Sequence, residues 1–120
     1  VKILAVDDTT MNLKVVKKLL QGTNAMIDTA SSGADALVMT LHTQYDVILM
    51  DHQMPEMDGI ECLHRIRNQE GGKSRNSKMI CLTANTGDEM AQLYHEEGFD
   101  GYLSKPVKAD ILKKTIQSVI

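Results

Sequence analysis

The chain has 120 residues and a formal net charge of −3 at pH 7. Hydrophobic residues make up 42% and charged residues 24%, which is ordinary usage for a globular protein. This length suits one domain, residues 1–120. The acidic balance argues against a nucleic-acid-binding surface, and the sequence has neither an apolar run of membrane-spanning length nor a signal peptide. We therefore expect a cytoplasmic domain that contacts neither nucleic acid nor membrane.

The two cysteines, Cys62 and Cys81, lie within apolar periodic segments and not in a spaced framework. We interpret both as reduced core residues, in preference to a disulfide or a metal site. This interpretation agrees with a cytosolic domain.

The first part of the chain alternates between strand and helix patterns. Val1–Asp8 is a near-continuous apolar run that ends in two acids, which indicates a strand buried on both faces. Met11–Gln21 carries apolar residues at helical spacing, and Gly22 is expected to end that helix. Ala25–Ala30 is a weaker strand candidate, and a second helix is predicted over Ala34–His42.

The middle of the chain repeats this alternation. Asp46–Asp51 is a second apolar run that ends in an acid, and Ile60–Asn68 has the apolar spacing of a helix. The polar stretch Asn68–Lys78 is interpreted as a solvated loop. It leads into a third apolar strand pattern, Lys78–Asn85.

The last part supplies one more strand with a helix on each side. Asp88 is predicted to cap a helix that runs to Glu97, where Gly98 stops it. Phe99–Ser104 is the fifth strand candidate, and residues 112–119 have the i, i+3, i+4, i+7 spacing of a final helix. Five strands alternating with five helices predict a doubly wound α/β fold with a parallel sheet and helices on both faces.

Charged and polar side chains follow several of these strands at the point where each strand ends. In open α/β sheets, ligands bind beyond the carboxyl ends of the strands, near the point where the strand order reverses. The residues that the sequence places there are three acids, one hydroxyl and one ammonium: Asp7, Asp8, Asp51, Thr83 and Lys105.

Three acids gathered in one place need a cation. Two unit negative charges about 4 Å apart repel by roughly 4 kcal/mol at an effective dielectric near 20. A hard divalent ion that accepts oxygen ligands, Mg²⁺ or Mn²⁺, suits such a site. Taken alone, Asp7 and Asp8 could cap the first helix and Asp51 could be a turn residue. Together with the lysine and the hydroxyl, they supply the parts for phosphoryl transfer.

Four motifs in this order resemble the receiver domain of two-component response regulators. They are the acid pair Asp7–Asp8, the segment "DHQMPEMDG" that begins at Asp51, "TAN" at Thr83–Asn85 and "KP" at Lys105–Pro106. The resemblance covers essentially the whole chain. It implies a flavodoxin-like sheet with strand order 2-1-3-4-5 and a phosphoacceptor signalling function that assists its own phosphorylation and dephosphorylation without being an enzyme.

The resemblance also implies a role for each acidic position. Asp51 would accept a phosphoryl group from the phosphohistidine of a histidine kinase or a histidine phosphotransfer protein. Asp8 and Asp51 would bind Mg²⁺ through their side chains and Gln53 through its backbone carbonyl, while Asp7 would act through water.

The remaining residues are expected to bind the phosphoryl group or to take part in the change that follows phosphorylation. Thr83 and Lys105 would hold phosphoryl oxygens, and the peptide bond between Lys105 and Pro106 would be cis. Tyr102 is hypothesised to turn inward when Thr83 moves, changing the surface made by the fourth helix, fifth strand and fifth helix. The alternative is a half-buried tyrosine with a solvated hydroxyl. Gln53 and Asn85 would tune the lifetime of the phosphorylated state, or would only line the pocket.

Two other classes of protein use related parts. A haloacid-dehalogenase-like phosphatase also has an aspartyl nucleophile, but Thr9 stands where its second acid should be. A flavin-binding module would need to cradle a phosphate, which the acidic loop repels. We expect a monomer, with dimerisation on phosphorylation and the output left open. Asn12 and the start at Val1 favour the receiver of a hybrid histidine kinase, on the cytosolic side of a membrane-bound parent.

Overall fold

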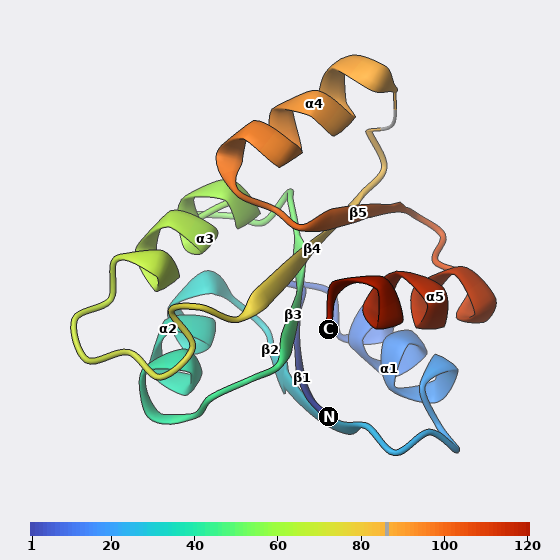
Figure 1. Cartoon of the computed structure of the whole chain (residues 1–120), viewed down its shortest axis with the longest axis horizontal. Coiled ribbons are helices and arrows are strands. Elements are labelled where there is room, and N and C mark those ends of the chain that lie inside the picture. The colour runs from blue at the N-terminus through green and yellow to red at the C-terminus, as the bar shows by residue number, and fades with distance from the viewer. Residues whose placement is uncertain (86) are drawn as a thin grey trace.

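The computed structural model describes residues 1–85 and 87–120 as a single parallel sheet flanked by helices (Figure 1). The five strands have the order β2-β1-β3-β4-β5, and each neighbouring pair is parallel. This arrangement confirms the predicted flavodoxin-like α/β fold. The strands are β1 (Lys2–Val6), β2 (Met26–Ala30), β3 (Val47–Asp51), β4 (Lys78–Thr83) and β5 (Gly101–Ser104).

Five helices connect the strands and cover both faces of the sheet. Helices α1 and α5 lie together on one face, and α2 and α3 lie together on the other (Figure 1). Tyr94 of α4 belongs to the same buried cluster as Cys62 of α3 and Ala36 of α2, so α4 joins the second face. The bounds are α1 (Thr10–Leu19), α2 (Gly33–His42), α3 (Gly59–Arg67), α4 (Asp88–Glu97) and α5 (Ala109–Val119).

The central strands are buried on both sides, as their near-continuous apolar sequences predict. Every residue of β3 is buried, and its side chains divide between two clusters. Ile48 and Met50 pack with α2 and α3, whereas Val47 and Leu49 pack with α1 and α5. This alternation follows from the period of two in a strand. It confirms that the sheet is the middle layer of three.

Strand register brings the chain segments of the predicted site to one edge of the sheet. Val6 of β1 pairs with Met50 of β3. The next residues of the two chain segments, Asp7 and Asp51, therefore lie side by side. In the next pair, Asp51 lies opposite Leu82 of β4. The predicted strand Val1–Asp8 is therefore too long at its end, because both acids lie in the loop that follows β1.

Helix ends follow the predictions at some positions and not at others. Gly98 caps α4 in the left-handed region at φ 114°, as predicted. The N-cap of α4 is Gly87, however, and Asp88 is the first helical residue, so the prediction of Asp88 as cap is wrong by one position. Gly22 also does not end α1 directly: the helix stops at Leu19, and Gly22 lies in the turn that follows at φ 84°.

The loop after α3 is more strongly anchored than a solvated loop would be. Ser74 and Ser77 are buried, and the Ser74 hydroxyl donates to the Thr43 carbonyl over 2.6 Å. The Arg67 guanidinium donates to the carbonyls of Arg75 and Ser77 over 2.8 and 2.6 Å. Backbone groups near the start of β3 and β4 need such partners. Most of this polar stretch is exposed, as predicted, but the two buried serines were not expected. Within the described ranges, none of the helices has the length and apolar character needed to cross a membrane.

Candidate functional site

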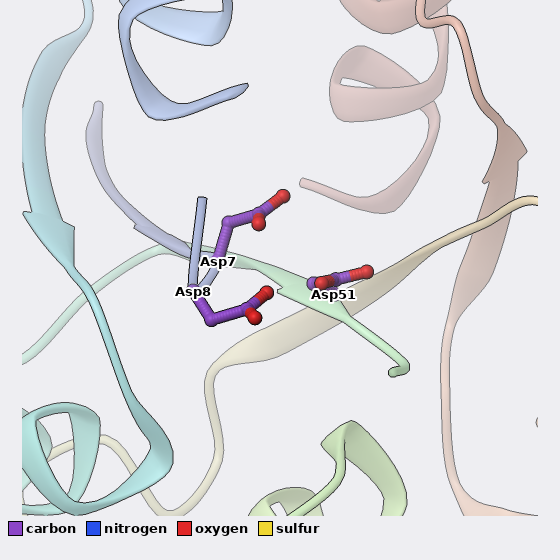
Figure 2. A group of neighbouring side chains, drawn as sticks. All are labelled: Asp7, Asp8 and Asp51. Atoms are coloured by element: carbon purple, nitrogen blue, oxygen red, sulfur yellow. The ribbon is translucent and has the colours of Figure 1, made fainter. Parts of the chain in front are cut away.

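Three carboxylates meet where β1 and β3 end (Figure 2). Asp7 and Asp8 follow β1, and Asp51 is the last residue of β3. One oxygen from each carboxylate lies within 4.8 Å of the other two. Asp7 and Asp51 are buried, with 3% and 4% of their surface exposed, whereas Asp8 is exposed. The three acids thus form a negatively charged site that is open on the side of Asp8.

The Lys105 ammonium lies against the two buried acids of this site. Its Nζ is 2.7 Å from Oδ1 of Asp51 and 3.3 Å from Oδ2 of Asp7. Lys105 directly follows β5, and its backbone N–H donates to the Thr83 carbonyl over 2.9 Å, which fixes the start of the loop. The peptide bond from Lys105 to Pro106 is cis. A lysine more than fifty residues from Asp51 in sequence thus becomes its direct partner.

Burial and charge act against each other on the two paired groups. Burial raises the pKa of Asp51 above 3.8, the charges of Asp7 and Asp8 raise it further, and the bond to Lys105 lowers it only in part. Burial alone would lower the pKa of Lys105, but its bond to Asp51 and the two nearby negative charges outweigh that effect and raise it. The site therefore carries more negative charge than its single ammonium offsets.

A hard divalent cation fits this donor set. Carboxylate oxygens are the ligands that Mg²⁺ prefers, and it keeps several of its waters when one or two carboxylates bind it. The exposed Asp8 leaves a side open for such waters. Burial is the main cause of the raised pKa of Asp51, and a dication would offset the smaller contribution from the charges of Asp7 and Asp8. The alternative role of Asp7 as a cap of the first helix is wrong, because the N-cap of α1 is Thr9 and no side chain in the described part of the chain caps this helix. Oδ1 of Asp7 accepts from the backbone N–H of Thr9 over 2.9 Å, while its Oδ2 faces Lys105.

Thr83 ends β4 and has a buried side chain. Its Oγ1 accepts a hydrogen bond from the Asn85 backbone N–H over 2.9 Å and another from the Tyr94 hydroxyl over 2.9 Å. The Tyr94 hydroxyl is also 2.9 Å from Nδ1 of His52. Our sequence reasoning missed Tyr94, because a tyrosine at a helical core position gives no sign of a polar partner.

The other predicted site residues line the rim. Tyr102 lies on β5 with 37% of its surface exposed, and its ring centroid is 6.2 Å from that of Tyr94. Gln53 and Asn85 are both exposed and lie in the loops after β3 and β4. Both side chains are therefore accessible to solvent. This is compatible with their predicted influence on an attacking water, which stays a prediction.

The two cysteines are core residues, as predicted. Cys62 and Cys81 are free and fully buried. Burial raises the pKa of each thiol to about 12, so neither is a thiolate in the folded protein at neutral pH.

Comparison with known proteins places this geometry in one family. Residues 3–117 match the family described as the response regulator receiver domain, so the chain belongs to it. Chemotaxis protein CheY4 of Vibrio cholerae superposes with a TM-score of 0.89 at 34% identity, covering 99% of this chain and 98% of that one. The receiver domain of the Pseudomonas aeruginosa sensor histidine kinase PA1611 gives a TM-score of 0.83 at 33% identity and covers 98% and 95%. That structure has a magnesium ion coordinated in its active site cleft.

Relatives among full-length proteins are much longer than this chain. Hybrid signal transduction histidine kinase B of Dictyostelium discoideum is 37% identical over 97% of the chain, which spans 6% of the kinase. Probable histidine kinase 4 of rice is 36% identical over 98% of the chain and 14% of the kinase. The chain is thus a phosphoacceptor domain of two-component signalling, similar to the receivers of hybrid kinases. These matches do not support the phosphatase alternative.

Proposed function

We propose that Asp51 is the residue that accepts the phosphoryl group. Its carboxylate is the nucleophile: one Oδ forms a bond to phosphorus, the P–N bond of a phosphohistidine breaks, and the electron pair returns to the donor imidazole. No general base is needed, because an ionised carboxylate has no proton to lose. The observation that supports this choice is the 2.7 Å contact between Lys105 Nζ and Asp51 Oδ1, beside two further acids.

Asp8 and Asp51 would hold Mg²⁺ through their carboxylates, with Gln53 contributing its backbone carbonyl and Asp7 acting through water. The bound ion would supply positive charge to the phosphoryl oxygens in the transition state. Mn²⁺ would serve in the same site, because it accepts the same oxygen ligands. The open side at Asp8 is consistent with an ion that keeps several waters.

Lys105 and Thr83 would bind the phosphoryl group once it is attached. The Lys105 ammonium already reaches the acceptor carboxylate, and a rotation of its flexible side chain would let it reach a phosphoryl oxygen two bonds beyond Oδ. Thr83 ends the neighbouring strand and carries a hydroxyl that can donate to another oxygen. Both groups would act on the charge of the transferred phosphoryl oxygens, so they would favour the phosphorylated form.

The response to phosphorylation would pass to the surface formed by α4, β5 and α5. The added group brings about one to two negative charges to the rim. Thr83 would move toward them, and Tyr102, which is 37% exposed, would turn inward in response. Gln53 and Asn85, at the exposed rim, would set how readily water attacks the acyl phosphate and returns Asp51 to its free form.

Residues 1–120 would act as one receiver domain whose phosphoryl donor is a histidine kinase or a histidine phosphotransfer protein. The relatives are long histidine kinases of which this chain spans only a small part. A hybrid kinase is therefore the favoured parent, with the domain on its cytosolic side. The domain would assist its own phosphorylation and dephosphorylation without acting as an enzyme on other substrates. Its unphosphorylated form would be a monomer.

Incubation with acetyl phosphate and Mg²⁺ tests the assignment of the acceptor. We expect intact-mass measurement to show one phosphoryl group per chain. This label should be absent when a chelator is present during the incubation, and absent in Asp51→Asn. Asp46→Asn is a matched control, because Asp46 is an exposed acid at the opposite end of β3. Labelling of Asp51→Asn to the same extent as the unchanged protein would contradict the proposal.

A further inference from the structure

A chain of side-chain hydrogen bonds ties α4 to the predicted switch residue Thr83. Tyr94, on α4, is buried with 1% of its surface exposed, and its hydroxyl donates to Thr83 Oγ1 over 2.9 Å. The same hydroxyl lies 2.9 Å from Nδ1 of His52, which follows the proposed acceptor directly. The phenol therefore lies between the loop that directly follows the acceptor and the end of β4.

The bonds at Thr83 leave no acceptor capacity unused. A threonine hydroxyl has two lone pairs, and here they accept from the Asn85 backbone N–H and from Tyr94. Burial raises the pKa of Tyr94, which keeps its phenol protonated and able to donate. Among the described residues, every buried side-chain nitrogen and oxygen has a hydrogen-bond partner. The Thr83 hydroxyl is thus held in place by satisfied bonds on two sides.

Phosphorylation requires this hydroxyl to do something else. In the proposed function, Thr83 donates to a phosphoryl oxygen on Asp51, so its Oγ1 must move toward that oxygen. The movement stretches or breaks the bond from Tyr94. The buried phenol then loses one of its two polar partners and keeps only the contact with His52, a cost that opposes the movement unless the ring or α4 moves as well.

We propose that Tyr94 is a positioning residue that holds Thr83 in its unphosphorylated arrangement, and so weakens binding of a phosphoryl group at Asp51. The proposal rests on the function proposed above, and adds a residue of α4 to it. Tyr94 acts through Thr83 and does not contact the phosphoryl group itself.

Packing around the Tyr94 ring gives the same residue a second effect. The ring makes edge contacts with His52 and Phe99, at centroid distances of 5.3 and 6.0 Å, and lies 6.2 Å from the ring of Tyr102. Because these rings are packed together, a shift of Tyr94 that follows Thr83 must be accommodated by its neighbours. Tyr102, with 37% of its surface exposed, is less confined by packing than the buried Phe99, so a shift of Tyr94 would pass through it to the surface of α4 and β5.

Beryllofluoride, a stable mimic of the phosphoryl group, provides the test. We would titrate it with Mg²⁺ into the whole chain and follow binding by NMR, comparing the unchanged protein with Tyr94→Phe. This substitution keeps the ring and removes only the hydroxyl. Loss of one hydrogen bond that exists only in the free form predicts binding about two- to tenfold tighter in Tyr94→Phe.

A double-mutant cycle and a matched control separate positioning from general loosening. In a Thr83→Ala background, Tyr94→Phe should have no effect on beryllofluoride affinity, because the bond is already gone. Tyr45→Phe removes the hydroxyl of a similarly buried tyrosine, which donates to Asp28 over 2.7 Å, away from the site. It should lower stability in urea and leave the affinity unchanged.

Three results would overturn the proposal: unchanged or weaker binding by Tyr94→Phe, the same gain in affinity in the Thr83→Ala background, and an equal gain in Tyr45→Phe. An unchanged protein that fails to bind beryllofluoride at all would overturn both this proposal and the assignment of Asp51. A protein that binds it normally, with no response to Tyr94→Phe, would overturn the role of Tyr94 alone.

Discussion

The ammonium of Lys105 makes a 2.7 Å contact with the carboxylate of Asp51 and a 3.3 Å contact with that of Asp7. The ammonium thus lies between the two buried acids of the site. Before phosphorylation, the positive charge of this lysine therefore offsets part of the negative charge of the two buried acids, as a bound metal ion would. The same contact opposes metal binding, because it lowers the negative charge that attracts the metal.

Lys105→Met should consequently separate metal binding from phosphorylation. The variant keeps the length of the side chain and leaves three acids without an internal cation, so we expect Mg²⁺ to bind about tenfold more tightly. Phosphorylation by acetyl phosphate should slow, because the transferred group loses a counter-charge. Calorimetric titration of Mg²⁺ and intact-mass kinetics measure the two effects. Lys108→Met, three residues away and exposed, is the control that should change neither.

Stability should respond to the charge of Asp51 in the direction that its pKa indicates. The folded-state pKa of Asp51 is raised above 3.8, so the folded protein holds this proton to higher pH than the unfolded chain. Ionisation of Asp51 therefore lowers the free energy of unfolding. This loss is complete above the folded-state pKa and absent below the unfolded-state pKa. We expect Asp51→Asn to raise the free energy of unfolding by about 1–2 kcal/mol at neutral pH.

Urea titrations at several pH values check this prediction. The gain from Asp51→Asn should disappear as the pH falls toward the ordinary aspartate pKa. Added Mg²⁺ should also reduce the difference in stability between the two proteins at neutral pH. Mg²⁺ should bind the unchanged protein more tightly than Asp51→Asn, and a ligand of the folded state stabilises the tighter binder more. A variant that is less stable than the unchanged protein at neutral pH would show that the bond to Lys105 outweighs the burial and repulsion at Asp51.

The sequence was informative about the site because topology, and not detailed packing, brings its parts together. Asp7, Asp51 and Thr83 each come at or just after the carboxyl end of an apolar run, and parallel strands place these ends on one edge. That placement needs only the assignment of strands. The position of Lys105 Nζ against Asp51 needs a loop conformation that no periodicity in the sequence describes.

Tertiary contacts account for what the sequence did not reveal. Tyr94 reads as one more apolar residue of an amphipathic helix, and its bonds to Thr83 and His52 exist only after α4 packs on the sheet. Likewise, the polar stretch after α3 gave no sign that Ser74 and Ser77 would be buried as partners for backbone groups. Polar residues that satisfy buried partners cannot be told from solvated ones by composition.

Thiol labelling should report the stability of the whole sheet. Cys81 lies on β4 and Cys62 on α3, both are fully buried, and burial raises each thiol pKa to about 12. An alkylating reagent that needs a thiolate should therefore modify neither cysteine in the folded protein at neutral pH. Both should react together in concentrated guanidinium, as mass spectrometry would show. Rapid modification of either one without denaturant would mean that its element opens separately from the rest.

Two glycines at matching positions should differ strongly in their tolerance of alanine. Gly33 and Gly59 are the first residues of α2 and α3, and each follows a side-chain N-cap, Ser32 or Asp58. A Cβ at Gly59 would lie 2.4 Å from the Asp51 backbone oxygen, which cannot move without displacing the proposed acceptor. At Gly33 the nearest atoms all belong to the Met57 side chain, the sulfur at 2.7 Å and Cβ and Cγ at 3.2 Å, and no backbone atom is among them.

We therefore expect Gly59→Ala to lower the free energy of unfolding by about 2–4 kcal/mol and Gly33→Ala by less than about 1 kcal/mol. Because both substitutions add the same methyl at the same helical position, differences in helix propensity largely cancel in the comparison. Urea unfolding of the two variants measures the effect. In Gly59→Ala, labelling by acetyl phosphate should also fall under conditions where the variant is folded, because the backbone of Asp51 is displaced. Equal stability losses in the two variants would show that the start of α3 can shift away from the Asp51 backbone as easily as the Met57 side chain shifts away from Gly33.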